Sequence, residues 1–384
     1  MRVDRAWVER NLGFDPITTP PPPSTFAVAK AAATQAPEDL RREMIDFDSE
    51  ASAGREFFAF SSATGLSRFT DIPWPTGFAP KTGPTPSARS NAPLPRADVL
   101  VVTWTVDEGH ALSRVLTPGK DSRNDYKPYT RNFATLAKKM RAGCPAREAG
   151  RLGTYWTTRI HGKKVVVFKS DSHMSQDGPQ LPNRDVWRQI IDDVRPKLVL
   201  TTGTAGGIGT QFEVGDVIVS PVVRFDCTSK FKAEPFALDH YESTPANPKY
   251  FATAKTLFKA NAGQLPKDNT RAPSIVRVSP SNGLGKSVVT TDFFGFDTSD
   301  DHYKLQGLGD VSEMGDAVLG LVAEDMGDQA PRWVAVRNVS DPQIKADGLT
   351  PKQQAALAAQ IYKGFGRWSS VCSAIVCWAL IAAE

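Results

Sequence analysis

The sequence predicts an α/β fold with a central, mixed and mostly buried β-sheet flanked by helices. From residue 99 onward, short runs of apolar and β-branched residues recur along the chain. Several are apolar at every position, which is typical of strands that are covered on both faces. Helix-like stretches lie between some of these runs. Because ligands of such folds bind beyond the strand ends, site residues are expected there.

The expected elements follow one another along the chain in the order that this fold requires. Strands are predicted over residues 99–103, 164–168, 197–202, 216–220, 287–291 and 333–340. Helices are predicted over residues 183–196 and 312–327, and again from residue 351. The last helix either runs on through "PKQQAALAAQIYKGFG" or begins again at "RWSSVCSAIVCWAL". Its most apolar stretch is shorter than the ~20 residues that span a bilayer, so we expect a buried helix.

The first 96 residues differ in composition from the rest of the chain. They hold 13 of the 29 prolines, in segments such as "TTPPPPS" and "KTGPTPSARSNAPLP", which resemble linkers. Between them, "APEDLRREMIDF" is typical of a short helix. The prediction is a Pro-rich, partly ordered N-terminal extension over 1–96 that packs on the main body or on a neighbouring subunit. The α/β domain is predicted over 97–384.

Composition narrows the class of protein. Hydrophobic residues make up 40% of the chain and charged residues 23%, as in a soluble globular protein. The net charge of +4 does not indicate a nucleic-acid partner. The four cysteines show no metal-type spacing, and the first residues lack an apolar signal core. We therefore expect free thiols, a cytoplasmic location, no membrane association, and neither a metal nor a cofactor.

A glycine-rich stretch, "TTGTAGGIGTQFEVGDVIVS" (201–220), is the most unusual feature. A strand is expected to end at Thr202, and Gly203, Gly206 and Gly207 would let the chain turn close to a ligand. A simple glycine turn between two strands is the alternative. A dinucleotide fingerprint does not fit, because the stretch leads into another strand and not into a helix. A P-loop does not fit either, since no G-K-[ST] follows.

The motifs in combination resemble a known family. "TGTAGGIG", then "VGDVIVS", then "VRNVSD" stand in the order found in the nucleoside phosphorylase and nucleosidase superfamily. The pattern is most similar to that of the methylthioadenosine/S-adenosylhomocysteine nucleosidases, and it covers residues 97–384. The resemblance implies cleavage of a purine N-glycosidic bond and a homo-oligomer, most simply a homodimer.

Cleaving such a bond requires a proton for the departing base, which a positioned carboxylic acid can supply. The resemblance assigns this general acid to Asp341, held by Ser340. It assigns the base's stacking wall to Phe294, with the Gly295 backbone at the edge of the base.

The attacking group is expected to be water. The resemblance assigns its activation to Glu108, with Asp107 and His110 as neighbouring alternatives, and its positioning to Arg337 and Thr204. A solvated loop charge is the competing interpretation of Glu108. The backbone beside Thr204 completes the predicted substrate contacts with Ala205 and Gly206.

One departure concerns the sugar. The family carries E-M-E at its central helix, where this chain has "SEMGDAVLG". Glu313 and Met314 fit, but Gly315 replaces the second glutamate. Either Asp316 or Glu313 takes over its role, or the sugar is held differently.

A second departure is the polar segment "KSDSHMSQDGPQLP", whose His173 and Gln176 are candidates for shaping a different pocket around the 5′ group. Arg224, Lys230 and Lys232 are candidates for meeting a nucleotide phosphate, or else are solvated surface residues.

Phosphorylases of this superfamily usually carry G-D-P-x-R after the first strand, to hold phosphate. Here Asp107 and Glu108 follow it, and two carboxylates repel an anion. We therefore expect a hydrolase acting on a purine nucleoside, nucleoside thioether or nucleotide. The alternatives are a phosphate-dependent phosphorylase and a non-catalytic nucleoside-binding module.

Overall fold

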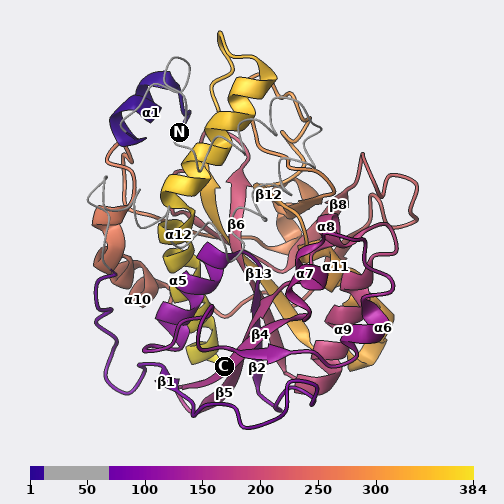
Figure 1. Ribbon diagram of the computed structural model, residues 1–384. Coiled ribbons are helices and arrows are strands. Elements are labelled where there is room, and N and C mark those ends of the chain that lie inside the picture. Colours follow the sequence, from indigo (N-terminus) through magenta and orange to yellow (C-terminus); the bar gives the residue numbers. More distant parts are fainter. Residues whose placement is uncertain (13–68) are drawn as a thin grey trace.

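The computed structural model describes residues 1–12 and 69–384, and every structural statement below concerns these residues. Here thirteen strands form one mixed sheet, so the predicted α/β fold is confirmed (Figure 1). The strands are β1 (Lys81–Thr82), β2 (Val99–Thr103), β3 (Lys127–Tyr129), β4 (Gly153–Ile160), β5 (Lys163–Ser170), β6 (Leu198–Gly207), β7 (Val217–Ser220), β8 (Val222–Asp226), β9 (His240–Glu242), β10 (Ile275–Arg277), β11 (Val288–Thr291), β12 (Val311–Glu313) and β13 (Arg332–Asp341).

The centre of the sheet is parallel. Its main order is β1-β4-β5-β2-β6-β12-β11-β8-β9, and β13 pairs with both β6 and β7. Strands β5, β2, β6 and β13 all run in one direction, so their carboxyl ends meet at one edge. All residues of β2 and β6 are buried, which explains why their sequences are apolar without alternation.

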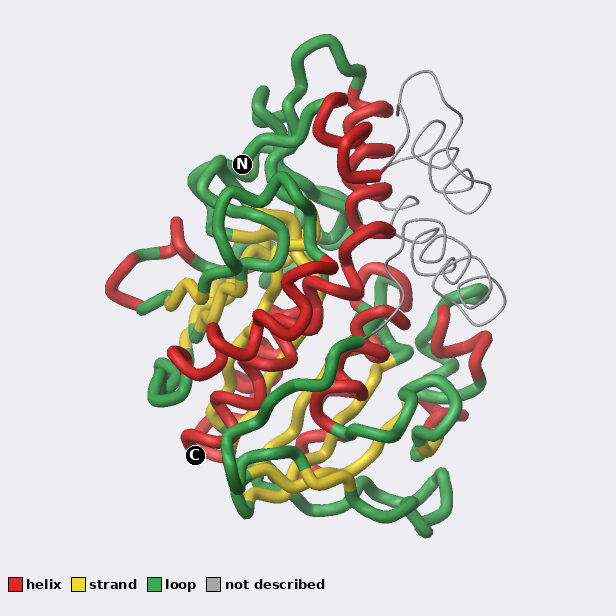
Figure 2. Tube along the Cα trace, turned by 90° about the vertical axis from the view of Figure 1, so that its left-hand side faces the viewer, coloured by secondary structure: helices red, strands yellow, loops and turns green. Residues whose placement is uncertain are grey.

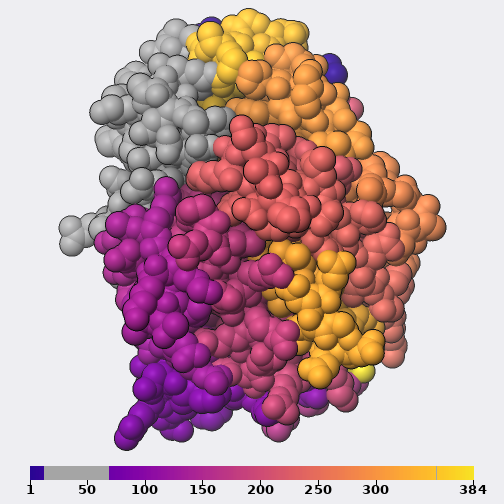
Figure 3. Space-filling model, turned by 90° about the vertical axis from the view of Figure 1, so that its right-hand side faces the viewer, coloured from indigo at the N-terminus to yellow at the C-terminus, as the bar shows by residue number. Residues whose placement is uncertain are grey.

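Helices cover the sheet in two groups (Figure 1). On one side lie α5 (Val106–Leu116), α10 (Phe251–Leu257) and α12 (Pro351–Ala383); on the other lie α6 (Phe133–Leu136), α9 (Pro182–Val194) and α11 (Asp316–Met326). The remaining helical segments are α1 (Arg5–Leu12), α7 (Pro145–Ala149), α8 (Met174–Asp177) and the short 3₁₀ turns η1 (Phe258–Gln264), η2 (Pro280–Asn282), η3 (Leu284–Lys286) and η4 (Gly327–Gln329). On the face in Figure 3, α9 and α11 lie against each other, joined by the ion pair of Arg184 with Asp325 at 2.5 Å.

The last helix is one continuous element. Thr350 caps α12 through the Gln353 N–H, and Pro351 occupies its first turn, where a missing N–H costs nothing. Figure 2 shows α12 as a long helix that runs beside the strands. By length and composition Gln353–Ala383 would suffice to cross a membrane, since an 18-residue stretch of it has a mean hydropathy of 1.4, but 94% of that 18-residue stretch is buried inside the protein. It is the buried helix that the sequence predicted, packed on β6 and β13.

The prediction that a strand ends at Thr202 is wrong. β6 continues to Gly207, because β13 remains paired with it as far as Gly206. The glycines therefore lie within a central strand, and the chain turns only afterwards, so neither the ligand-binding loop nor the simple turn describes them. Similarly, α11 begins at Asp316 and not at residue 312, because Val311–Glu313 forms β12.

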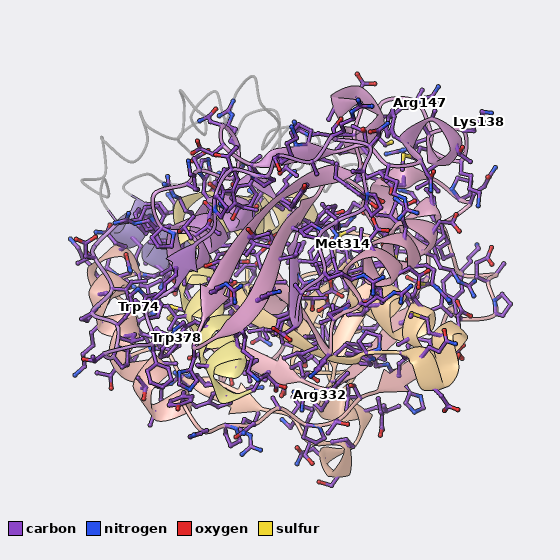
Figure 4. The ribbon with its side chains drawn as sticks, turned by 90° about the horizontal axis from the view of Figure 1, so that it is seen from below. Trp74, Lys138, Arg147, Met314, Arg332 and Trp378 are labelled. Atoms are coloured by element: carbon purple, nitrogen blue, oxygen red, sulfur yellow. The ribbon has the colours of Figure 1, made fainter. Side chains whose placement is uncertain are left out.

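Parts of the N-terminal 96 residues pack on the main body. Val3 forms a parallel bridge with Ile344, and Lys81–Thr82 pairs with β4. The ring centroids of Trp74 and Trp378 lie 4.9 Å apart, and Figure 4 labels the two residues near each other. The helix and the proline run expected between residues 18 and 47 lie outside the described residues. The domain boundary at residue 96 remains a prediction.

Candidate active site

Glu108 lies in a helix and not in a loop. Its carboxylate Oε2 accepts hydrogen bonds from the Thr105 N–H at 2.9 Å, the Trp104 N–H at 3.1 Å and the Thr103 hydroxyl at 3.0 Å. Together with the bond from the Glu108 N–H to Thr105 Oγ1, this is a capping box that starts α5. Because Glu108 is only 2% exposed, the interpretation as a solvated charge is wrong.

The other oxygen of Glu108 binds β6. Oε1 accepts from the Thr204 N–H at 2.8 Å and from its hydroxyl at 2.7 Å. A Cβ atom on Gly203 would lie 2.6 Å from Glu108 Cδ, so only glycine permits this approach. Burial opposes ionisation of Glu108, but the charge of Arg337 and the hydrogen bonds from Thr204 and Thr105 outweigh it and lower its pKa. This carboxylate is therefore ionised and held between α5 and β6.

Arg337 binds two acidic side chains of the β12–α11 connection. Its Nε donates to Asp316 Oδ2 at 2.7 Å and its Nη2 to Asp316 Oδ1 at 2.5 Å. Nη2 also lies 3.0 Å from Glu313 Oε2. The indole ring of Trp104 lies under the guanidinium, with its centroid 4.7 Å from Cζ. All four side chains are buried, so the positive charge is matched inside the protein.

These contacts bear on which acidic residue, Asp316 or Glu313, takes the role of the family glutamate that Gly315 replaces. Asp316 is engaged by Arg337, whereas Glu313 also lines the cavity described next. The Trp104 ring occupies the space beside Gly315, 3.6 Å from the position of a Cβ atom there. Burial and the charge of Asp316 raise the pKa of Glu313 to about 7. Of the two acidic candidates, the structure places Glu313 at the cavity.

A small cavity lies between the ends of β6, β12 and β13. It is lined by Thr204, Ala205, Gly206, Phe294, Gly295, Ser312, Glu313, Met314, Ser340, Asp341 and Tyr362. Nine of these residues were predicted from the sequence as site residues. The cavity holds about 20 Å³, room for roughly one water molecule. A larger ligand enters only when the walls move apart.

Asp341 lies close to several polar groups at the cavity wall that β6 forms. Ser340 Oγ donates to Asp341 Oδ1 at 2.6 Å. A Cβ atom on Gly206 would lie 3.0 Å from Asp341 Oδ2, 3.2 Å from Ser312 Oγ and 3.6 Å from the Gly295 carbonyl oxygen. Glycine at 206 thus lets the carboxyl group, the hydroxyl and the carbonyl oxygen converge on β6.

The apolar walls come from two further residues. Phe294 is 7% exposed and lines the cavity, but it also packs in the core, with its ring 5.6 Å from that of Phe296. Met314 is 3% exposed and lies near the middle of the view in Figure 4.

Some predicted residues lie elsewhere. Asp107 and His110 do not line the cavity, and His110 Nδ1 binds Asp121 Oδ2 at 2.8 Å. Lys230 Nζ donates to the Ser175 carbonyl at 3.0 Å. Arg224, on β8, and the exposed Lys232 do not line the cavity either.

Sequence reasoning missed three residues. Ser312 and Tyr362 line the cavity, and Trp104 packs on Arg337. The Tyr362 hydroxyl donates to Thr105 Oγ1 at 3.1 Å, which links α12 to the cap of α5. Only Ser312 has a local signal, because it adjoins the recognised Glu313.

Metal-binding groups are not found in the described part of the chain, where no three His, Cys, Asp or Glu side chains cluster suitably. The cysteines at 144, 227, 372 and 377 are buried and unpaired with one another.

Comparison with known protein families identifies the superfamily of this chain. The sequence model of one family, the phosphorylase superfamily, matches residues 128–366. The chain therefore belongs to the phosphorylase superfamily.

Individual relatives are more distant. A 5'-methylthioadenosine/S-adenosylhomocysteine nucleosidase of Chromohalobacter salexigens is 35% identical over 72 residues, which cover 18% of this chain and only 28% of that protein. The Neisseria meningitidis 5'-methylthioadenosine/S-adenosylhomocysteine nucleosidase, solved with methylthio-immucillin-A, is 15% identical, with a TM-score of 0.44 over 75% of this chain and 100% of that one. A futalosine hydrolase of Helicobacter pylori is 13% identical, with a TM-score of 0.44 over 73% and 95%.

Proposed function

We propose that this protein hydrolyses the N-glycosidic bond of a purine nucleoside or a 5′-substituted relative, releasing the free base and the sugar. The observation that carries the proposal is the convergence on one cavity of a carboxyl group, Asp341, an aromatic wall, Phe294, and the Thr204 hydroxyl bound to Glu108. These groups match the requirements of the reaction: an acid for the base, a stacking surface, and a route for a proton from water.

In the proposed hydrolysis, Asp341 and Glu108 each have one role. As the bond from C1′ to N9 breaks, the proton of Asp341 passes to N7 of the base, which leaves neutral. The water oxygen bonds to C1′, and the proton that it loses ends on Glu108. Asp341 finishes ionised and Glu108 finishes protonated, so the charges balance.

The geometry supports an indirect route to Glu108. Its oxygens already accept five hydrogen bonds, which fills a carboxylate's acceptor sites. Thr204, however, lines the cavity, and its hydroxyl donates to Glu108 at 2.7 Å. In the proposed step this hydroxyl takes the proton of the water and passes its own proton to Glu108. The Arg337 charge near Glu108 keeps that carboxylate ionised before the step.

The first prediction concerns Asp341. Incubation with a panel of purine nucleosides, thioethers and nucleotides, followed by chromatography, should reveal free base. Asp341→Asn keeps the shape and lowers base release by ~10²–10⁴-fold, because a general acid is lost. Full activity of this variant, with an unchanged melting temperature, would remove Asp341 from the mechanism.

The second prediction tests the relay. Thr204→Val keeps the volume but removes the hydroxyl, and Thr204→Ser is the matched control that retains it. We expect base release to fall about 100-fold or more in the valine variant and to persist in the serine variant. Full activity of the valine variant would show that the Thr204 hydroxyl is not needed for proton transfer.

The superfamily also contains phosphorylases, so phosphate is part of the test. Base release should proceed at an unchanged rate without phosphate, giving a sugar with a free C1′ hydroxyl. An obligatory need for phosphate, with sugar 1-phosphate as product, would replace hydrolysis by phosphorolysis. Binding of a nucleoside without base release would identify a non-catalytic module.

A further inference from the structure

Buried polar groups join the end of β13 to the cavity wall that carries Phe294. Gln343, two residues after Asp341, donates from its side-chain Nε2 to Asp297 Oδ2 at 2.7 Å. The same oxygen accepts from the Gly209 N–H at 2.7 Å, just beyond β6. Gln343 and Asp297 are each 2% exposed. Because buried polar groups are costly unless they are paired, these bonds favour one arrangement of the three segments.

Backbone hydrogen bonds join the same two segments, which we call the stacking segment (293–299) and the connecting segment (343–346). The Ile344 N–H donates to the Asp297 carbonyl at 2.9 Å, and the Ser299 N–H donates to the Ile344 carbonyl at 2.8 Å. The position of the aromatic wall therefore depends on the connecting segment, which follows the proposed general acid in the chain.

The first residues of the chain pack against the connecting segment. This N-terminal arm (residues 2–12) forms a parallel bridge from Val3 to Ile344, which also bridges the stacking segment. The Val3 N–H donates to the Gln343 carbonyl at 2.9 Å. Arg2 Nε donates to Gln343 Oε1 at 2.7 Å. The connecting segment thus lies between the arm and the stacking segment.

The side-chain amide of Gln343 joins a cation to an anion. Its oxygen accepts from the Arg2 guanidinium, and its nitrogen donates to the Asp297 carboxylate. Because a guanidinium only donates and a carboxylate only accepts, this orientation of the amide satisfies both groups. Hydrogen bonds to charged groups are stronger than neutral ones. Release of Arg2 should therefore weaken the contact that holds the stacking segment.

The arm also covers the helix that supplies another wall of the cavity. The ring centroids of Trp7 and Phe365 lie 5.9 Å apart, edge to face. A Cβ atom on Gly364 would lie 2.6 Å from Leu12 Cδ2. Both α12 residues are within one turn of Tyr362, which lines the cavity. Two walls of the cavity are thus supported by the arm.

The stacking segment is the wall that must move to admit a base. The cavity holds about 20 Å³, far less than a purine requires. Most of its lining residues belong to β6, β12, β13 or α12, whereas Phe294 and Gly295 lie in the connection between β11 and β12. Displacing a connection breaks fewer contacts than displacing a central strand.

We propose that the N-terminal arm is a latch on the substrate cavity, and that Gln343 and Asp297 are the positioning residues through which it holds Phe294 against the base. The inference rests on the proposed function. With the arm docked, the cavity is closed. The substrate enters when the contact of Arg2 with Gln343 breaks, and the contact forms again over the bound base.

The latch acts on binding and not on proton transfer. Asp341 is held by Ser340 and pairs with Gly206 of β6, so its position does not depend on the arm. Loosening the stacking segment should therefore weaken the contact with the base and leave the general acid in place. In kinetic terms, KM should change and kcat should not.

The first test follows hydrogen exchange at pH 8 in the protein without ligand. Arg2→Gln removes the contact of the arm at an exposed side chain. Gln343→Glu keeps an acceptor for Arg2 but places a second carboxylate against Asp297. Amides of the stacking segment should exchange about 10-fold faster in both variants, because one charge-assisted hydrogen bond is lost. Amides of the arm should exchange faster in Arg2→Gln alone.

Arg10→Gln is the matched control. It changes the same charge on the same arm, but Arg10 pairs with Asp268, at 2.6 Å, and not with the connecting segment. Exchange of the stacking segment should be unchanged in this variant. Equal acceleration in the control would overturn the assignment to Arg2 and Gln343.

The second test measures base release. In Arg2→Gln and Gln343→Glu, KM should rise several-fold while kcat stays within about two-fold of the wild type. A role in folding alone would instead lower the melting temperature and the active fraction, and hence kcat.

The outcomes separate this inference from the proposed reaction. Unchanged exchange of the stacking segment in both folded variants overturns the latch, and so does a loss confined to kcat. Faster exchange in the two variants, with no base release by the wild type on any purine substrate, overturns the proposed reaction alone.

Discussion

Two polar regions lie on either side of Trp104, and they differ in how completely their groups are paired. Around Arg337 no buried side-chain atom of Glu108, Glu313 or Asp316 lacks a partner within the described chain. Beyond Trp104, whose ring meets that of Trp187 edge-on at 6.1 Å, four buried atoms of α8 and α9 do: Gln176 Nε2, Asp177 Oδ1, Asn183 Oδ1 and Trp187 Nε1. The difference indicates that the first region is organised before any ligand arrives, as electrostatic catalysis requires. The second carries the energetic cost of unpaired buried polar atoms.

The largest effect is expected from breaking the paired region. Arg337→Met leaves Glu313 and Asp316 buried beside each other without their counter-charge. The free energy of unfolding should fall by about 3–5 kcal/mol, as measured by urea denaturation. The control is Arg184→Met, whose exposed pair with Asp325 should cost less than about 1 kcal/mol. Similar losses of unfolding free energy in the two variants would mean that the buried Arg337 network contributes no more stability than the exposed pair.

The second region, beyond Trp104, should make the stability of the protein depend on pH. Burial raises the pKa of Asp177 from 3.8 to about 7, so the folded state holds this proton to higher pH than the unfolded state. Stability therefore falls as pH rises from about 4 to 7, by at most about 4 kcal/mol from this group. Asp177→Asn should flatten that fall when unfolding is followed at pH 5 and pH 8. An equally steep fall in the variant would show that Asp177 is ionised in the folded protein.

A smaller loss of stability is expected when a methyl group is added at Gly203, beside the paired region. Gly203→Ala places a methyl group 2.6 Å from Glu108 Cδ and should cost about 1–3 kcal/mol of stability. Base release should fall as well, because the bond from Thr204 to Glu108 is displaced. Gly315→Ala serves as the control, since its nearest neighbour lies 3.6 Å away. Melting temperature and base release are measured for both, and a Gly203→Ala variant as active as the control would contradict the tight approach.

Much of the fold could be predicted because several of its strands are apolar at nearly every position. The segments at 99–103 and 333–340 were recognised nearly to their ends. The extension of β6 through Gly207 could not be recognised, because pairing with β13, more than a hundred residues later, keeps those glycines extended. β4 was missed although "GTYWTTRI" is rich in β-branched and aromatic residues.

The site was predicted less evenly. Asp341 and Phe294 were found through motifs, and the structure brings them to one cavity. The capping box in "TVDE" is a local signal that would have placed Glu108 in a helix. By contrast, the engagement of Asp316 by Arg337 joins side chains 21 residues apart, and sequence spacing gives no sign of it.

The position of α12 in the chain has a consequence for synthesis. This helix covers β6 and β13, and it follows both of them in the sequence. While the chain emerges from the ribosome, the central strands are complete before the helix that buries their face exists. Until then a broad apolar surface is open to other chains, which favours aggregation. Production of the folded protein should therefore respond strongly to chaperone supply and to slower growth at low temperature.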